Sequence, residues 1–233
     1  MSVVVVGPQR WPSRQMLDAA LAQLPQGPGR VVVNWGCSVG PEGSLNASPR
    51  LNALEQLTRF QTAGVLCPKF YTTREQARQA LLDAPDLVWG RRLLHTKGYD
   101  IAQRPHSRRW QQSEFWVEVF GVVREEWRVQ ICRGRSIARG LKHPVEPGAE
   151  ASLIRNSRLG WRQRHDIDPP RGVRSAAKAA CAAVGYDFGA VDLLVLEDLR
   201  VVVLEVNRCP GLDAYSASAY ARAFTALTNN IRN

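Results

Sequence analysis

The sequence has little cysteine and lacks the spacings that build disulfide frameworks or zinc sites. Its 233 residues include five widely separated cysteines with no Cys-x-x-Cys pair, and its four histidines show no metal-ligand spacing. An odd number of scattered cysteines is typical of a reduced protein, so we expect a cytoplasmic location.

Long hydrophobic runs are also missing. No apolar stretch reaches the roughly 18 residues needed to cross a bilayer, so no membrane partner is expected. The four consecutive valines at residues 3–6 are too few for the core of a signal peptide, and no basic leader precedes them. These valines predict a first β-strand instead.

The common phosphate-binding and nucleophile motifs are absent or incomplete. Neither a Walker-type loop nor a Gly-x-Gly-x-x-Gly fingerprint occurs. Residues 36–40 match the Gly-x-Ser-x-Gly pattern of a serine hydrolase, but that motif needs a helix beginning at the serine. Pro41, Gly43 and Pro49 follow Ser38 and argue against such a helix. The sequence therefore disfavours a serine hydrolase, and a bound nucleotide would need a different architecture.

Acidic residues are outnumbered by basic ones. The chain has 31 Lys and Arg against 21 Asp and Glu, a formal net charge of +10. Such an excess indicates a polyanionic partner, which could be nucleotide phosphates, nucleic acid or an acidic peptide. Solvated arginines without a ligand would give the same count, so charge alone does not choose among these alternatives.

Hydrophobic periodicity predicts helices mixed with strands, several of them in hairpins. This mixture favours an α+β protein with separate lobes over a single parallel sheet. The first 35 residues predict strand, helix and strand, and residues 36–48 predict a loop. Helices are expected at 52–63, 73–82 and 172–184, and extended segments at 65–71, 87–89, 115–123, 127–132 and 137–141.

Two apolar segments near the C-terminus carry the most informative polar residues. Residues 188–196 are almost continuously hydrophobic but include Asp192, and residues 201–206 are apolar up to Glu205, with Asn207 beyond. A turn at residues 197–199 would fold them into a hairpin that sets Asp192 opposite Glu205. Two facing carboxylates repel, and a divalent cation removes the conflict. Asn207 supplies a third oxygen, so the pattern favours Mg²⁺; an ion-paired Asp and a strand-end Glu are the alternative.

The order of features resembles the ATP-grasp superfamily of ATP-dependent ligases, in particular its small phage and bacterial members. The resemblance runs over residues 52–213. Its most specific part is the Gly-Ala-Val-Asp-Leu-Leu segment at 189–194, followed by Glu-Val-Asn-Arg-Cys-Pro-Gly at 205–211. The resemblance implies an α+β ATP-grasp fold whose two lobes grip ATP. It assigns Mg²⁺ binding to Asp192, Glu205 and Asn207.

Further site residues are implied by the same resemblance. Arg91 and the short glycine loop with Lys97 and Gly98 would cover the triphosphate. The strand residues that would line adenine are Glu118, Val119 and Phe120. Three residues would act near the reaction centre, namely Arg128, Lys142 and Asn156.

The resemblance also implies a division of the chain and an activity. Residues 1–66 would form an N-terminal α/β segment and residues 67–233 the ATP-grasp domain, with 67–118 as the smaller lobe and 119–233 as the larger. ATP and Mg²⁺ would serve an ADP-forming ligase that joins a carboxylate to an amine through an acylphosphate. The carboxylate could belong to a small molecule, a peptide, or an acidic or nucleic-acid-linked substrate. An ATP-grasp kinase and an inactive basic nucleic-acid-binding module are the alternatives.

Overall fold

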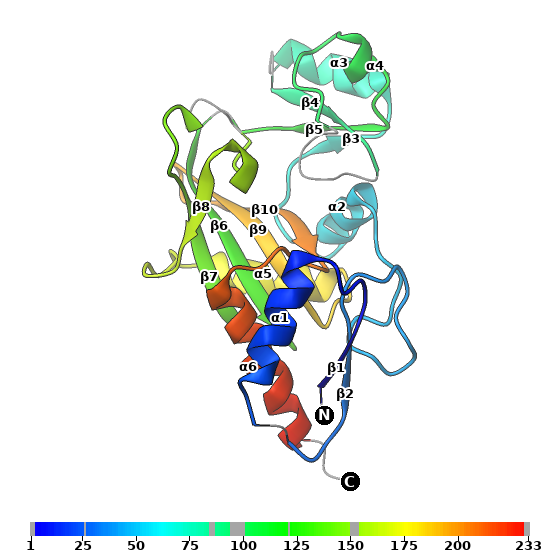
Figure 1. The fold of residues 1–233 in the computed structure, drawn as a ribbon. Coiled ribbons are helices and arrows are strands. Elements are labelled where there is room, and N and C mark those ends of the chain that lie inside the picture. The colour runs from blue at the N-terminus through cyan, green and yellow to red at the C-terminus, as the bar shows by residue number, and fades with distance from the viewer. Residues whose placement is uncertain are drawn as a thin grey trace.

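The computed structural model describes residues 3–25, 27–83, 87–93, 101–120, 122–149 and 154–230. Three sheets organise the chain: a two-stranded, a three-stranded and a five-stranded one (Figure 1). Helices mixed with largely antiparallel sheets confirm the α+β prediction. Within the described ranges, no helix is both long and apolar enough to span a bilayer.

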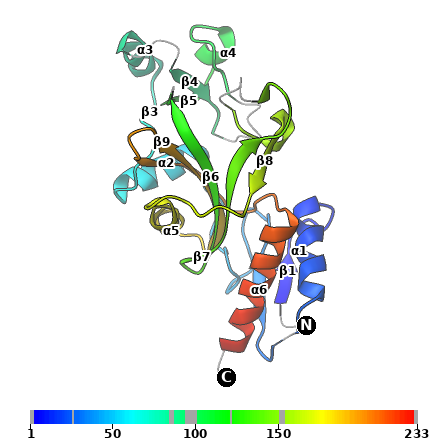
Figure 2. The ribbon, with the colours of Figure 1, turned by 90° about the vertical axis from the view of Figure 1, so that its left-hand side faces the viewer.

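The N-terminal residues form the strand–helix–strand unit that the sequence predicts. Its elements are β1 (Val3–Val6), α1 (Pro12–Ala22) and β2 (Val31–Asn34). The two strands pair in parallel, with Val3 opposite Val31. Helix α1 lies beside the C-terminal helix α6 (Ala214–Asn230) (Figures 1 and 2). Trp35 stacks on Phe188 of the large sheet, with the ring centroids 5.5 Å apart. The unit therefore shares its core with the large sheet.

The three-stranded sheet forms a separate lobe with the order β3-β5-β4 (Figure 1). Its elements are α2 (Ala53–Thr62) leading into it, β3 (Phe70–Tyr71), α3 (Arg74–Asp83), β4 (Val88–Arg91), α4 (Arg108–Gln111) and β5 (Phe115–Glu118). Helix α2 begins where predicted, because Asn52 and Glu55 form a reciprocal capping box. The extended segment at 65–71 ends in the short β3. One strand prediction was wrong: residues 115–123 belong to two sheets, because the chain crosses between lobes after Glu118.

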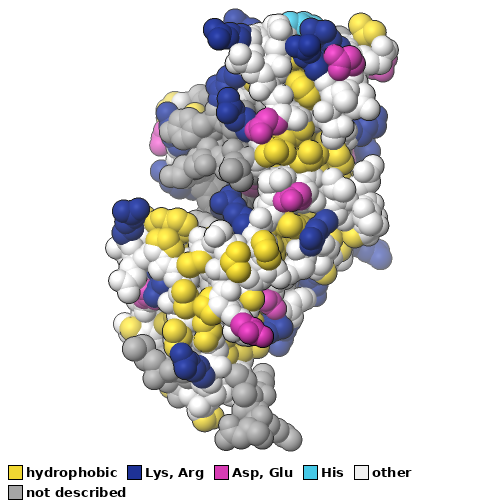
Figure 3. All heavy atoms as spheres, turned by 90° about the vertical axis from the view of Figure 1, so that its right-hand side faces the viewer, with side chains coloured by type: hydrophobic (Ala, Val, Ile, Leu, Met, Phe, Trp, Pro, Cys, Tyr) yellow, Lys and Arg dark blue, Asp and Glu magenta, His cyan; other side chains and the backbone are white. Residues whose placement is uncertain are grey.

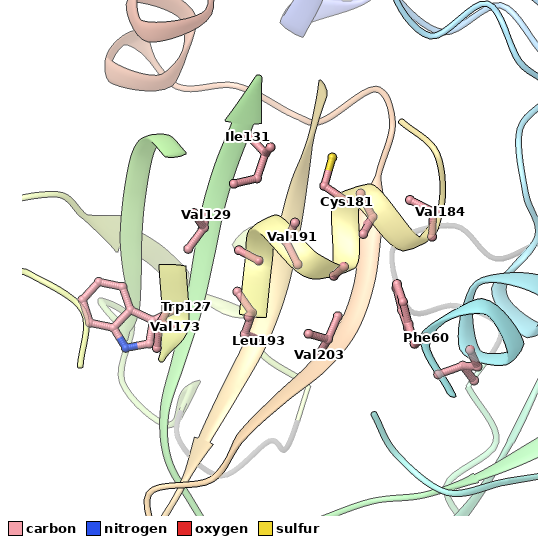
Figure 4. Close-up of a cluster of buried hydrophobic side chains, with 14 of the residues drawn as sticks. Phe60, Trp127, Val129, Ile131, Val173, Cys181, Val184, Val191, Leu193 and Val203 are labelled. Atoms are coloured by element: carbon pink, nitrogen blue, oxygen red, sulfur yellow. The ribbon is translucent and has the colours of Figure 1, made fainter. Parts of the chain in front are cut away.

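The five-stranded sheet carries most of the core. Its order is β10-β9-β6-β7-β8, all antiparallel. The elements are β6 (Val123–Cys132), β7 (Arg135–Pro144), the 3₁₀ turn η2 (Ser157–Leu159), β8 (Trp161–Arg164), α5 (Val173–Ala183), β9 (Phe188–Leu196) and β10 (Val201–Asn207). Helix α5 packs on one face, where Trp127, Val129, Val191 and Leu193 are fully buried (Figure 4). The alternate residues of β6 and β9 therefore point to the opposite face.

Helix α6 covers one end of that opposite face, which the sequence analysis did not anticipate. Its Tyr220 hydroxyl donates to Gln130 on β6 at 3.0 Å. The helix begins after Asp213, whose carboxylate accepts the Ser216 N–H at 2.9 Å. Asp213 also accepts from His165 Nε2 at 2.7 Å, so the same carboxylate ties α6 to the segment after β8. The other end of the face stays free of α6.

Removing the Asp213 carboxylate should destabilise the fold in a pH-dependent way. Burial alone would raise the pKa of Asp213, but the bonds from Ser216 and His165 lower it below its ordinary value. A lowered pKa means that this stabilisation is present above the ordinary carboxyl pKa and is lost as pH falls through the folded-state value. We expect Asp213→Ala to cost about 1 kcal/mol at neutral pH and progressively less in acid. Urea unfolding at several pH values measures this.

Asp166→Ala provides the matched control. Asp166 pairs with Arg164 across an exposed surface, where ion pairs contribute little. Equal losses for the two variants, or a loss at Asp213 that does not shrink in acid, would contradict the capping role.

Candidate active site

Asp192 and Glu205 face each other across β9 and β10, as the sequence predicts. A bulge between Val203 and Glu205 shifts the register, so that Val203 pairs with Leu193 but Glu205 pairs with Asp192. Without this bulge, residue 204 would oppose Asp192 and the Glu205 side chain would point to the α5 face. The bulge therefore brings the two carboxylates together on the face that α6 leaves uncovered.

Arg128 lies on the neighbouring strand β6, directly opposite Asp192. Its guanidinium donates to both carboxylate oxygens of Asp192, with Nε–Oδ1 at 2.7 Å and Nη2–Oδ2 at 2.6 Å. Burial alone would lower the pKa of Arg128, but the Asp192 carboxylate outweighs this and raises it. The cation therefore stays charged, and the pair is a rigid bidentate contact.

A second group of charges lies beside this pair. Lys142 on β7 donates to Glu126 on β6 and to the carbonyl of Arg155 at 3.0 Å, and its Nζ lies 3.9 Å from Asp192. The Arg155 Nε is 3.9 Å from Glu126, and its guanidinium lies over the Trp161 ring. Burial raises the pKa of Glu126 more than Lys142 lowers it, and Asp192 raises it further. Charged side chains of both signs thus extend the site across β10, β9, β6 and β7.

Asn207 contacts both carboxylates of the pair. Its amide nitrogen donates to Glu205 at 2.7 Å and contacts Asp192 at 3.4 Å. Within the described residues, no group of three His, Cys, Asp or Glu side chains could hold a metal. Rotation of the Asn207 side-chain amide by half a turn would point its oxygen toward the two carboxylates. These three oxygen ligands suit Mg²⁺, which takes water and phosphate at its remaining coordination positions. The donor set therefore fits the predicted cation.

Removing one member of the buried Lys142–Glu126 pair should destabilise the protein strongly. Both side chains are largely buried, so Lys142→Met leaves a buried carboxylate without its nearest cation. We expect a loss of about 3 kcal/mol in the free energy of unfolding. Lys178→Met, which removes an exposed lysine of α5, should change it little. Adding Glu126→Gln to Lys142→Met should recover part of the loss; an additive double variant would show that the two side chains are not coupled.

Several predicted ATP-site residues lie in or near the other lobe. Arg91 ends β4, and Glu118 ends β5, where Tyr71 donates to its carboxylate and Lys69 lies 3.7 Å away. The Val119 N–H already donates to the carbonyl of Leu87. Phe120 packs with Leu194 and Leu196. The structure therefore places Phe120 against the sheet that carries Asp192, and Arg91 at the end of β4 in the three-stranded sheet.

The remaining predicted residues divide into two cases. Lys97 and Gly98 lie outside the described residues. Asn156 follows Arg155 in the chain, and its side-chain oxygen accepts the N–H groups of Arg158 and Leu159, so it caps the turn η2. This contact gives Asn156 a local structural role next to the charge cluster.

The comparisons with known proteins rest on structure. No family model matches the sequence, and no curated protein matches it. The solved structure of the ATP-grasp ligase PsnB complexed with minimal precursor is similar over 98% of this chain and 99% of that one, with a TM-score of 0.67 and 14% identity. The macrocyclase MdnC from Microcystis aeruginosa MRC, bound with precursor peptide MdnA, covers 98% and 99%, with a TM-score of 0.63 and 14% identity.

A third similar structure is the RimK domain protein ATP-grasp from Sphaerobacter thermophilus DSM 20745. It covers 99% of this chain and 98% of that one, with a TM-score of 0.64 and 12% identity. At identities this low, the structural similarity establishes the fold alone. The matches extend over nearly the whole chain. The protein therefore has the ATP-grasp fold.

Proposed function

We propose that this protein is an ATP- and Mg²⁺-dependent ligase that joins a carboxylate to an amine and releases ADP. The observation that carries the proposal is the convergence of Asp192, Glu205, Asn207 and Arg128 at the end of the large sheet that lies away from α6. The fold supports it, because PsnB, which shares that fold, was solved with its precursor, Mg and ADP.

The nucleotide would bind beside these charges. An apolar cluster continues the same face of the sheet, comprising Leu194, Leu196, Val202, Phe120, Val123 and Leu204. Adenine would lie against this cluster, close to the chain segment Glu118, Val119 and Phe120, and its phosphates would reach toward Asp192. Arg91, Lys97 and Gly98 would cover the triphosphate from the smaller lobe. In this proposal residues 67–118 and 119–233 are the two gripping lobes, and residues 1–66 are the N-terminal segment.

The charged residues have separate tasks in the proposed reaction. Bound Mg²⁺, held by Asp192, Glu205 and Asn207, would neutralise the β- and γ-phosphates. Arg128 is aimed by its two bonds to Asp192 and would stabilise negative charge on the γ-phosphoryl group. Lys142, which donates to Glu126, would lie beside the reacting carboxylate. Asn156 would act near the reaction centre, where its cap of η2 also fixes the chain next to Arg155.

The proposed reaction has two steps. A carboxylate oxygen attacks the γ-phosphorus, the bond from that phosphorus to the β–γ bridging oxygen breaks, and ADP leaves. The amine nitrogen then attacks the acyl carbon of the acylphosphate, loses a proton, and displaces inorganic phosphate to leave an amide. Exclusion of water would protect the acylphosphate from hydrolysis.

A peptide is the favoured source of the carboxylate, because PsnB was solved with precursor peptide PsnA2 and MdnC with precursor peptide MdnA. A nucleic-acid-binding module is the main alternative of another class. On the face drawn in Figure 3, Lys and Arg side chains are interspersed with acidic and apolar ones and form no continuous stripe. That face does not favour binding to a phosphate backbone.

The proposed activity predicts Mg²⁺-dependent ADP release that rises when a carboxylate and an amine are supplied together. Screening acidic peptides with and without free amines, with ADP as the readout, tests this directly. A kinase would instead give a stable phosphorylated product without an amine. A nucleic-acid module would give no ADP and would bind nucleic acid with a steep dependence on salt. Either result would overturn the ligase assignment.

A further inference from the structure

A hollow lies between the loop after β2, the beginning of α2 and the end of β10. Glu205 and Asn207 line it, so it adjoins the proposed metal site. Its other polar lining includes Arg50, Gln56, Tyr186 and Arg208. The proposed chemistry uses none of these four residues.

Arg208 is a buried cation without a buried anion to match it. The residue is only 5% exposed. Its guanidinium donates to the carbonyls of Ser38, at 3.0 Å, and Asn46, and its buried Nε has no hydrogen-bond partner. In the part of the chain that the structure describes, no carboxylate pairs with it. Because neutral carbonyls do not cancel a full charge, burial of this cation costs free energy that a bound anion would offset.

Two other lining residues add to this electropositive hollow. The Tyr186 hydroxyl accepts the Leu51 N–H at 2.8 Å, and its ring lies 5.7 Å from the Arg208 guanidinium. Among the described residues its own proton has no acceptor, so it can donate to a ligand. Arg50 is exposed at the rim and forms no ion pair within the described ranges. Two cations and a hydroxyl thus face one space.

We propose that this hollow binds a second carboxylate of the ligase substrate, one that does not react. The inference rests on the proposed function and narrows it: the acid substrate is a dicarboxylate or an acidic peptide segment with two neighbouring carboxylates. One carboxylate lies at Arg128 and the metal, and the other lies between Arg50 and Arg208. A planar monoanion matches the guanidinium fork, whereas Glu205 in the same hollow repels a dianionic phosphate more strongly.

Calorimetry and thermal shift on the full chain test this site without knowledge of the natural substrate. The probes are malonate, succinate and glutarate, with propionate and inorganic phosphate as comparisons. We expect at least one dicarboxylate to bind and to raise the melting temperature, and propionate to have little effect. Tighter binding of phosphate than of every dicarboxylate would overturn the assignment to a carboxylate.

Arg50→Met is the informative variant, because Arg208 also holds the loop through Ser38 and Asn46 and its loss could unfold that loop. We expect Arg50→Met to weaken dicarboxylate binding about tenfold, the effect of one charge-assisted hydrogen bond. The control Arg78→Met removes an exposed arginine of α3 and should leave binding unchanged. Equal affinities in the two variants would overturn the inference.

Binding of Mg²⁺-ATP, measured on the same preparations, separates the two proposals. Normal Mg²⁺-ATP binding without any dicarboxylate binding would sink the second-carboxylate site and leave the ligase standing. Dicarboxylate binding that depends on Arg50, without Mg²⁺-ATP binding, would overturn the ligase and with it the role of this hollow as a substrate site.

Discussion

Asp192→Asn should lower Mg²⁺-dependent ADP release by about 10³-fold, the scale of losing a preorganised electrostatic contact in a transition state. The substitution removes one of two facing carboxylates and leaves Arg128 with a neutral partner. The site would then hold the cation with one carboxylate only. Steady-state ADP release at saturating Mg²⁺ and ATP measures the loss, and circular dichroism checks that the variant folds.

Glu205→Gln separates loss of the cation from loss of the Arg128 contact. Glu205 lies on β10, and its replacement leaves the Arg128–Asp192 bonds in place. We expect a loss of similar size from this variant. Asp198→Asn, in the exposed turn of the same hairpin, is the matched control and should keep full activity. Near-normal turnover in either site variant would show that these carboxylates do not hold the catalytic metal.

Arg128→Lys should lower ADP release about 10²-fold while changing Mg²⁺-ATP affinity less than tenfold. Lysine keeps the charge but replaces a planar fork, which bonds both oxygens of Asp192, with a single ammonium group. The cation would therefore still attract phosphate but would no longer be aimed at one position. The rate of ADP release and the calorimetric affinity, measured separately, test this split.

Arg124→Lys is the control for this substitution, because Arg124 is a more exposed arginine near the start of the same strand. We expect Arg124→Lys to keep the ADP release rate and the Mg²⁺-ATP affinity of the unmodified protein. An Arg128→Lys variant with full activity, or one that loses rate and affinity equally, would mean that Arg128 only helps to bind the nucleotide.

The hairpin could be predicted because its apolar runs and its few polar residues are visible in the sequence. A carboxylate inside the buried strand β9 needs a partner, and the polar end of β10 supplies one. The bulge before Glu205 could not be predicted, since it depends on backbone hydrogen bonds that leave no mark in the side chains. The predicted pair was right, although a regular hairpin with the observed turn would have missed it by one residue.

Other features escaped the sequence for physical reasons. One such feature is the charge cluster of Glu126 on β6, Lys142 on β7 and Arg155 before η2. These residues are far apart in the sequence, so no local pattern marks their contact. Asn156 stays a predicted active-site residue, and the sequence did not reveal that its side chain also caps η2, because that turn was not predicted. Helix α6 mixes alanines with serines and threonines, so its hydrophobic pattern is weak. The Asp213–Ser216 cap is the sequence signal for its start. Residues 115–123 look like one strand because periodicity does not reveal which sheet a residue joins.

The most direct test of the central claim is calorimetric titration of ATP into the wild-type protein, with Mg²⁺ present and with Mg²⁺ chelated. We expect a single binding event with Mg²⁺ that weakens strongly when the metal is removed, because Asp192 and Glu205 would then repel the phosphates. Equal binding under both conditions, or no binding under either, would contradict the assignment of this site to Mg²⁺ and ATP.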